Sequence, residues 1–131
     1  MRAFASLSVV VLLGVAACTA PEPFKVVEVD LSNKIDAGNR VYSPGTVFSA
    51  DSTVYASIAT EGAGEAKLAA TWFDADGTTV LAEQSQDVEQ DAPAHYEFHH
   101  KPEGGWTQGK RYSVILSVDG GQKRNREFEI R

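Results

Sequence analysis

Hydrophobic and polar residues alternate along most of the chain beyond residue 24. A period of two is typical of β-strands, because successive side chains of a strand point to opposite faces of its sheet. The alternation predicts seven main strands, at residues 25–31, 53–60, 67–73, 79–82, 94–100, 110–118 and 122–130. An eighth, short strand would fit at residues 45–50.

One side of each predicted strand is apolar, and that side is expected to face a core. Residues 74–77 (Asp-Ala-Asp-Gly) and 119–121 (Asp-Gly-Gly) are expected to form tight turns, because glycine adopts the positive φ that short hairpin loops need. The expected core residues are Val27, Val29, Leu31, Phe48, Val54, Ala56, Ile58, Leu68, Ala70, Trp72, Tyr96, Phe98, Tyr112, Val114, Leu116, Val118, Phe128 and Ile130.

Short strands joined by glycine-rich turns, with no helical stripe, predict an all-β protein with one antiparallel β-sandwich. The segments STVYASI, ATWFDADG, GGWTQGKRYSVILSVDG and FEI resemble the immunoglobulin-like domains of small exported bacterial lipoproteins. The resemblance covers residues 47–131 and carries no catalytic motif. It implies an immunoglobulin-like or fibronectin III-like sandwich of about seven strands, with Trp72 buried in the third.

The start of the chain has the parts of a secretory signal: one positive charge at Arg2, a short apolar run, and small residues before the only cysteine, Cys18. The apolar run is shorter than the roughly 20 residues that span a bilayer. The sequence Val-Ala-Ala-Cys resembles a bacterial lipobox, which implies that Cys18 is lipidated and becomes the first mature residue. We therefore expect a signal peptide at 1–17, a lipidated tether at 18–24 and the immunoglobulin-like domain at 25–131.

Lipidation of Cys18 would make the membrane a partner through the anchor, with the domain facing the periplasm. Lipoproteins with an Asp after the cysteine are held at the inner membrane. Thr19 stands there instead, which resembles the outer-membrane class. The alternative is an ordinary secreted protein cleaved near Ala17, with Cys18 a free thiol.

Charge is distributed unevenly along the chain, which carries 12 basic and 18 acidic residues. Residues 41–100 hold ten of the acidic residues and only one basic residue, Lys67. Such a balance argues against nucleic acid or anionic lipid as the main partner and favours a basic protein. The alternative is an acidic surface that only interacts with solvent.

Residues with the potential for catalysis or metal binding are sparse. The sequence has no nucleophile elbow, zinc-protease motif or phosphate-binding loop, so we expect no enzyme and no cofactor. His95, Glu97 and His99 would share one face of a strand, with neighbours about 7 Å apart. Two histidines so widely separated do not chelate one ion, and no metal site is expected.

Four residues are candidates for contact with a protein partner. Tyr42 lies in the long segment 32–51, and long ordered loops often carry function. Asp87 and Glu89 lie in the hydrophilic stretch 83–91. Trp106, flanked by glycines, could be an exposed anchor or a buried plug that covers Tyr112, and the resemblance to immunoglobulin-like domains favours the plug.

Together these features predict a non-enzymatic, lipid-anchored periplasmic module that binds another protein. One alternative is an inhibitor or immunity lipoprotein that neutralises a toxin or a cell-wall hydrolase. The other is a structural accessory of an envelope complex.

The lipobox predicts the outcome of one substitution. Cys18→Ser removes the only thiol that could receive lipid, so the precursor should stay uncleaved or a soluble form should be released. Incorporation of labelled fatty acid measures this directly. Equal labelling of the variant and the parent would contradict lipidation at Cys18.

Overall fold

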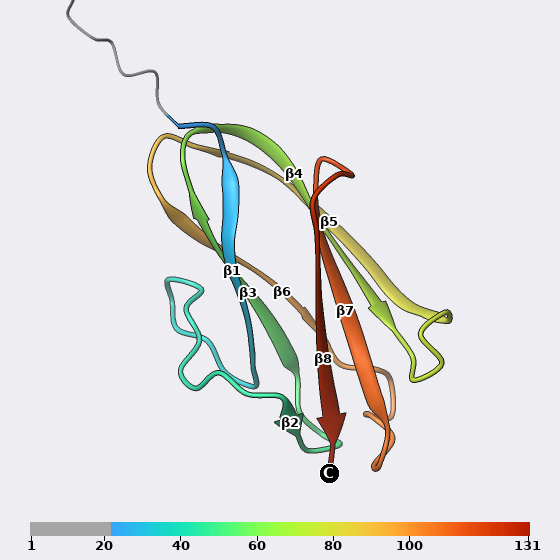
Figure 1. The fold of residues 1–131 in the computed structure, drawn as a ribbon. Helices are drawn as coiled ribbons and strands as arrows, with labels where there is room; N and C mark the ends of the chain where they lie inside the picture. Colours follow the sequence, from blue (N-terminus) through green and yellow to red (C-terminus); the bar gives the residue numbers. More distant parts are fainter. Residues whose placement is uncertain (1–21) are drawn as a thin grey trace, which may run out of the picture.

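A computed structural model describes residues 22–131, which form eight strands and no helix (Figure 1). None of the described residues belongs to a helix that could span a membrane. The predicted signal peptide and most of the tether, including Cys18, lie outside the described residues. The strands are β1 (Lys25–Ser32), β2 (Val47–Phe48), β3 (Val54–Glu61), β4 (Gly64–Phe73), β5 (Val80–Gln90), β6 (Ala94–His100), β7 (Arg111–Val118) and β8 (Lys123–Ile130).

The strands form two sheets, one in the order β1-β3-β6 and the other in the order β2-β8-β7-β4-β5. All pairings are antiparallel except that of β2 with β8. The two sheets share one hydrophobic core, an arrangement that fits a β-sandwich. The all-β prediction is therefore confirmed, with β2 as the additional short strand.

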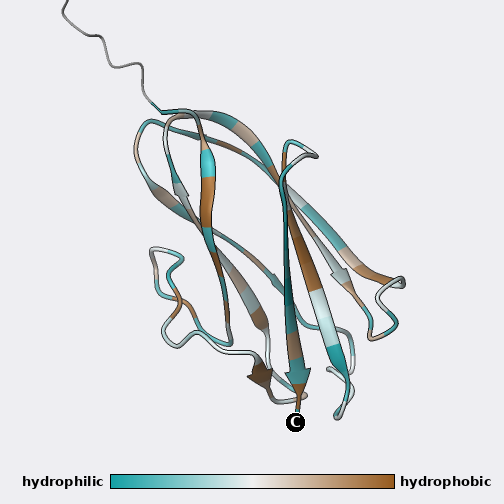
Figure 2. Cartoon of the chain, in the orientation of Figure 1, coloured by the Kyte–Doolittle hydropathy of each residue, from teal (hydrophilic) through white to brown (hydrophobic). Residues whose placement is uncertain are grey.

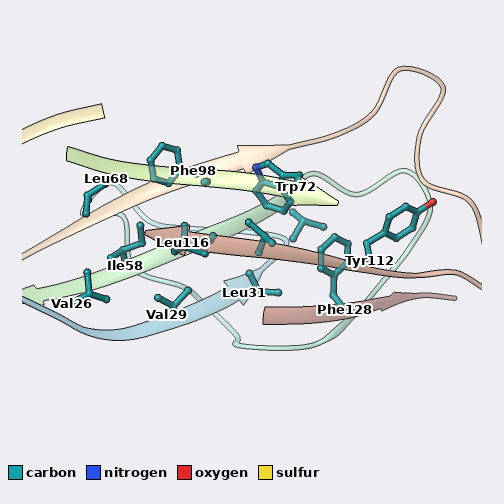
Figure 3. Close-up of a cluster of buried hydrophobic side chains, with 14 of the residues drawn as sticks. Val26, Val29, Leu31, Ile58, Leu68, Trp72, Phe98, Tyr112, Leu116 and Phe128 are labelled. Atoms are coloured by element: carbon teal, nitrogen blue, oxygen red, sulfur yellow. The ribbon is translucent and has the colours of Figure 1, made fainter. Parts of the chain in front are cut away.

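The core is built from alternate residues of facing strands (Figure 3). Trp72 of β4 and Phe128 of β8 come from one sheet, and Val29 of β1 and Ile58 of β3 come from the other; each is at most 2% exposed. Figure 2 shows the corresponding alternation of hydrophobic and hydrophilic residues along the strands. No buried side-chain nitrogen or oxygen of the described residues lacks a hydrogen-bond partner.

The predicted inward position of Val27 is wrong. The register of β1 against β3 shifts between Val26 and Glu28, as in a β-bulge. An extra residue in one strand reverses the faces of the residues before it. Val26 is consequently buried and Val27 is 37% exposed, whereas Val29 and Leu31 keep their predicted inward positions.

The strand predicted at 79–82 is also wrong in length, because β5 continues to Gln90. Its partner β4 pairs with it from Gly64 to Phe73. Most inward positions in the second half of β5 are glutamines, so the apolar alternation that marks a strand stops early. Asp87 and Glu89 therefore lie on a strand and not in an irregular segment.

The inward glutamines of β5 close one open side of the two-sheet structure. Gln84 donates through Nε2 to the carbonyl oxygen of His99 on β6 (2.7 Å), and Gln86 donates likewise to Glu97 (2.8 Å). The side-chain oxygen of Gln84 also accepts a hydrogen bond from the indole N–H of Trp72 (2.9 Å). These bonds satisfy edge carbonyls that have no strand partner.

Arginines of β8 close the opposite side. Arg124 donates to the carbonyl oxygen of Val26 (3.0 Å) and Arg126 donates to that of Val29 (2.9 Å), both on β1. Hydrogen bonds from a charged donor are stronger than those between neutral groups. The arginines of the last strand therefore cover an edge of the neighbouring sheet, in keeping with the edge-protection role of basic residues.

The inward faces predict the cost of truncating core side chains. Leu116→Ala should lower the free energy of unfolding by about 2–5 kcal/mol and Trp72→Ala by about 3–5 kcal/mol, from lost burial and a residual cavity. Val27→Ala, on the bulge, should cost about 1 kcal/mol or less, since the side chain is already partly exposed. Urea unfolding compares the three variants. Equal losses for Leu116 and Val27 would contradict the observed faces.

Candidate functional site

The candidate residues Asp87 and Glu89 line a shallow groove of about 550 Å³ on the outer face of the larger sheet. Both are exposed and come from β5, the edge strand. Two residues of β4, Glu65 and Lys67, form the neighbouring wall, and the turn between β7 and β8 contributes Asp119. The groove thus combines four carboxylates with one ammonium group.

Strand register determines which of these charges are neighbours. Glu65 lies opposite Glu89, and Lys67 lies opposite Asp87. Residues directly opposite on one face of a sheet are close enough to interact, and two like charges repel. None of these five groups forms an ion pair within 4 Å in the part of the chain that the structure describes.

Asp119 reaches the groove because of the turn that contains it. Its φ of 51° and that of Gly120, 71°, form the tight connection that the sequence predicts. Asp119 Oδ1 accepts a hydrogen bond from the backbone N–H of Lys67 (2.7 Å), and its own N–H donates to the Lys67 carbonyl (2.8 Å). These two hydrogen bonds hold the Asp119 carboxylate beside the first residues of β4.

The candidate residue Tyr42 lies outside the groove that Asp87 and Glu89 line. Its side chain is 64% exposed, and Lys34 Nζ lies 4.9 Å from the centre of its ring. The loop that carries it is held on the outer face of the smaller sheet: Asn39 accepts through its carbonyl from the Ser57 hydroxyl and donates to the His95 carbonyl (3.2 Å). The structure therefore does not bring Tyr42 together with Asp87 and Glu89.

Of the two interpretations of Trp106, the buried plug is confirmed and the exposed anchor is wrong, because the side chain is only 4% exposed. The indole N–H donates to the carbonyl of Ser52 (2.8 Å). Its ring centre lies 4.8 Å from that of Tyr112 and 5.0 Å from that of Phe128. The alternative of a buried plug over Tyr112 describes this position.

The stripe of His95, Glu97 and His99 lies on the outer side of β6. His99 Nδ1 is 3.0 Å from a carboxylate oxygen of Glu97. Within residues 22–131, no group of three His, Cys, Asp or Glu side chains is placed to hold a metal ion.

Glu65 and Asp119 are groove residues that the sequence analysis missed. The sequence held only part of the signal for Glu65: a turn at 74–77 implies that the flanking strands pair, but Glu65 comes to lie opposite Glu89 only through the register shift between Trp72 and Phe73. Placing Glu65 also requires β5 to be recognised over its full length. Asp119 could be placed at the groove only from the pairing of β7 with β4, which no local sequence pattern reveals.

No family model matches the chain, and no curated protein matches it. Three solved structures share its fold over most of its length. Alkylpurine DNA glycosylase AlkC of Pseudomonas fluorescens, bound to DNA with an abasic site analog, is 14% identical over 82% of this chain and 30% of that chain, with a TM-score of 0.53.

The second is a putative β-galactosidase from Bacteroides fragilis, 17% identical over 79% of this chain and 16% of that chain, with a TM-score of 0.53. The third is a β-glucosidase from Listeria innocua in complex with isofagomine, 9% identical over 84% of this chain and 16% of that chain, with a TM-score of 0.52. The chain spans less than a third of each of these proteins. Identities this low show a similarity of fold alone.

A half-buried histidine, His100, packs beside the Trp106 plug. The ring centre of His100 lies 5.8 Å from that of Trp72 and 5.6 Å from that of Trp106. Burial lowers the pKa of His100, and the neighbouring His99 lowers it further. The folded state therefore disfavours the charged imidazole.

This lowered pKa predicts the direction of a stability change. The unfolded chain takes up the His100 proton more readily, so stability should fall as pH drops below about 6.5, the usual histidine pKa. The free energy of unfolding, measured between pH 8 and 5.5, should fall more in the parent than in His100→Gln. Asp76, whose pKa hydrogen bonds from Thr79 and Thr78 lower to about 2, titrates below this window. Parallel pH profiles for the two proteins would contradict the assignment.

Proposed function

We propose that residues 25–131 form an immunoglobulin-like β-sandwich of the fibronectin III type. The strand order supports this: β1, β3 and β6 form the smaller sheet, and the larger one contains two hairpins, β4–β5 and β7–β8, that pair with each other through β4 and β7. Trp72 is fully buried in β4, where sandwiches of this type commonly bury a tryptophan. The parallel pairing of the short β2 with β8 extends the larger sheet.

The domain is a non-enzymatic, protein-binding module whose partner presents a basic surface to the groove of Glu65, Asp87, Glu89 and Asp119. The observation that carries this proposal is the set of carboxylates without ion pairs in one open concavity. Glu65 opposite Glu89 costs stability rather than adding to it, since like charges repel across a strand pair. A basic partner would relieve that repulsion on binding.

Anchoring through Cys18 at the outer membrane, facing the periplasm, belongs to the same proposal and rests on the resemblance to a lipobox. The position of Glu22 adds a consequence. Its carbonyl oxygen accepts a hydrogen bond from the N–H of Ala63 (2.8 Å), two residues before Glu65. The groove thus lies at the end of the domain where the described chain begins, and an anchor would keep it close to the membrane.

A second candidate is an inhibitor or immunity lipoprotein. The same acidic groove favours it, because carboxylates could cover a basic site on an enzyme. The role of structural accessory to an envelope complex would use the same contact without changing the partner's activity. Assaying the captured partner with and without the domain separates these two roles.

Charge reversal tests the groove. Asp87→Lys combined with Glu89→Lys should slow association with the partner captured from envelope extract and flatten the salt dependence of the rate. Salt screens such attraction, since the Debye length falls from about 10 Å at 0.1 M to about 3 Å at 1 M. The on-rate on immobilised protein measures the effect, and the fold should be little changed, because exposed charges add little stability.

Glu28→Lys combined with Glu103→Lys is the matched control. Both residues are exposed, neither is in an ion pair with another residue of the described range 22–131, and the change in net charge is the same. The control variant should keep most of the parent's on-rate. A partner whose on-rate ignores salt, or responds equally to both double variants, would contradict binding at the groove.

A further inference from the structure

Four strands lie at sheet edges: β1 and β6 in the smaller sheet, β2 and β5 in the larger one. An edge strand offers unpaired N–H and C=O groups to which another chain can add. We propose that the free edge of β5 receives an extended, basic segment of the partner as an additional strand. This rests on the proposed function and specifies how the partner is bound.

The edges of the smaller sheet are covered by hydrogen bonds from within the domain. On β1, the outward carbonyls accept from Arg124, Arg126 and the N–H of Gly45. On β6, they accept from side chains of Asn39, Gln86 and Gln84. β2 has only two residues, which is too short an edge to receive a strand of ordinary length.

The direction of the β5 backbone follows from its neighbour. Lys67 of β4 exchanges both of its backbone hydrogen bonds with Asp119, beyond the end of β7, so its N–H and C=O point away from β5. Backbone direction alternates along a strand. The residues of β4 that hydrogen-bond to β5 are therefore the two neighbours of Lys67 in the sequence and every second residue beyond them. Their partners on β5 are Ala82, Gln84, Gln86, Val88 and Gln90.

The intervening residues of β5 point their backbone groups to the free edge. These are Glu83, Ser85, Asp87 and Glu89, and all four are exposed. The same residues place their side chains on the outer face, since alternate residues share one face. An added strand would thus meet the free backbone groups and the carboxylates together.

Charge determines which segment fits. β5 has three acidic residues and no basic one, and Glu65 and Asp119 lie beside it. A second copy of β5 pairing with the first would bring acidic residues face to face, which is unfavourable. A segment with Lys or Arg at alternate positions would place cations beside Glu83, Asp87 and Glu89, and its backbone would complete the ladder.

The closing experiment separates backbone pairing from charge. The probe is a blocked peptide of about nine residues, the length of an ordinary strand, with Lys at alternate positions and Thr or Val between them. Ser85→Pro removes the central N–H of the free edge, which β4 does not use, and proline is tolerated at such positions. Ser85→Ala keeps that N–H and is the control.

With full-length protein in detergent, Ser85→Pro should weaken peptide binding about tenfold and Ser85→Ala about twofold or less, by calorimetric titration. A peptide N-methylated at alternate residues keeps its charge but loses the donors that face β5, and it should bind the unaltered protein at least about tenfold more weakly. The comparison of the two peptides uses the unaltered protein, so its result does not depend on whether Ser85→Pro folds. Amide exchange should slow at residues 83, 85, 87 and 89 when the unmodified peptide binds.

Three results would overturn strand addition. If the unmodified peptide does not bind, or if N-methylation and Ser85→Pro have no effect, the edge receives no basic strand. The groove proposal would still stand, provided that Asp87→Lys with Glu89→Lys slows association of the captured partner. Dimerisation of the protein alone that Ser85→Pro abolishes would make a second copy the occupant, and would likewise overturn the proposal.

Discussion

The fold depends on satisfying the backbone carbonyls at its two open sides. A closed barrel has no edge strands, whereas each of two stacked sheets ends in an edge strand on both sides. A backbone carbonyl of an edge strand that is removed from water without a hydrogen-bond partner costs free energy. Here long side chains of the larger sheet reach across to the edges of the smaller one: Arg124 and Arg126 to β1, and Gln84 and Gln86 to β6. The sheets are thus joined by directional bonds at their margins as well as by the nondirectional core.

The same constraint explains where sequence reasoning succeeded. Strands whose inward positions are mostly apolar, such as β3 and β7, were predicted within a few residues of their observed bounds. Trp72 and the two turns around Gly77 and Gly120 followed from the alternation and from glycine's tolerance of positive φ. Each of these features is encoded by neighbouring residues.

The errors come from positions where the apolar period is interrupted. Gln84 and Gln86 face inward on β5 because they bond to β6, so a hydropathy pattern cannot distinguish their strand from a polar loop. Val27 was assigned inward because a bulge leaves no local mark in the alternation. Trp106 was ambiguous because its burial depends on the carbonyl of Ser52, far away in the sequence.

The candidate site was predictable only in part. Local charge excess pointed to Asp87 and Glu89, but their neighbours Glu65 and Asp119 enter through strand register and a turn. Tyr42 and Asp87 lie on the outer faces of different sheets, because the loop of residues 33–46 folds back over β3 and β6.

The contact at the start of the described chain has a mechanical consequence. Gly62 (φ 81°) lies so close to Pro23 that an added Cβ would be 2.2 Å from the Pro23 carbonyl oxygen, and Ala63 bonds Glu22. A force pulling on the chain ahead of Glu22 would first load this latch and the turn between β3 and β4. Only after the latch opened would the load reach the pairing of β1 with β3, which begins at Lys25 opposite Glu61. Tension on the chain would therefore act first on the end of the domain that bears the groove, and the opposite end, where the C-terminus lies in Figure 1, would be reached last.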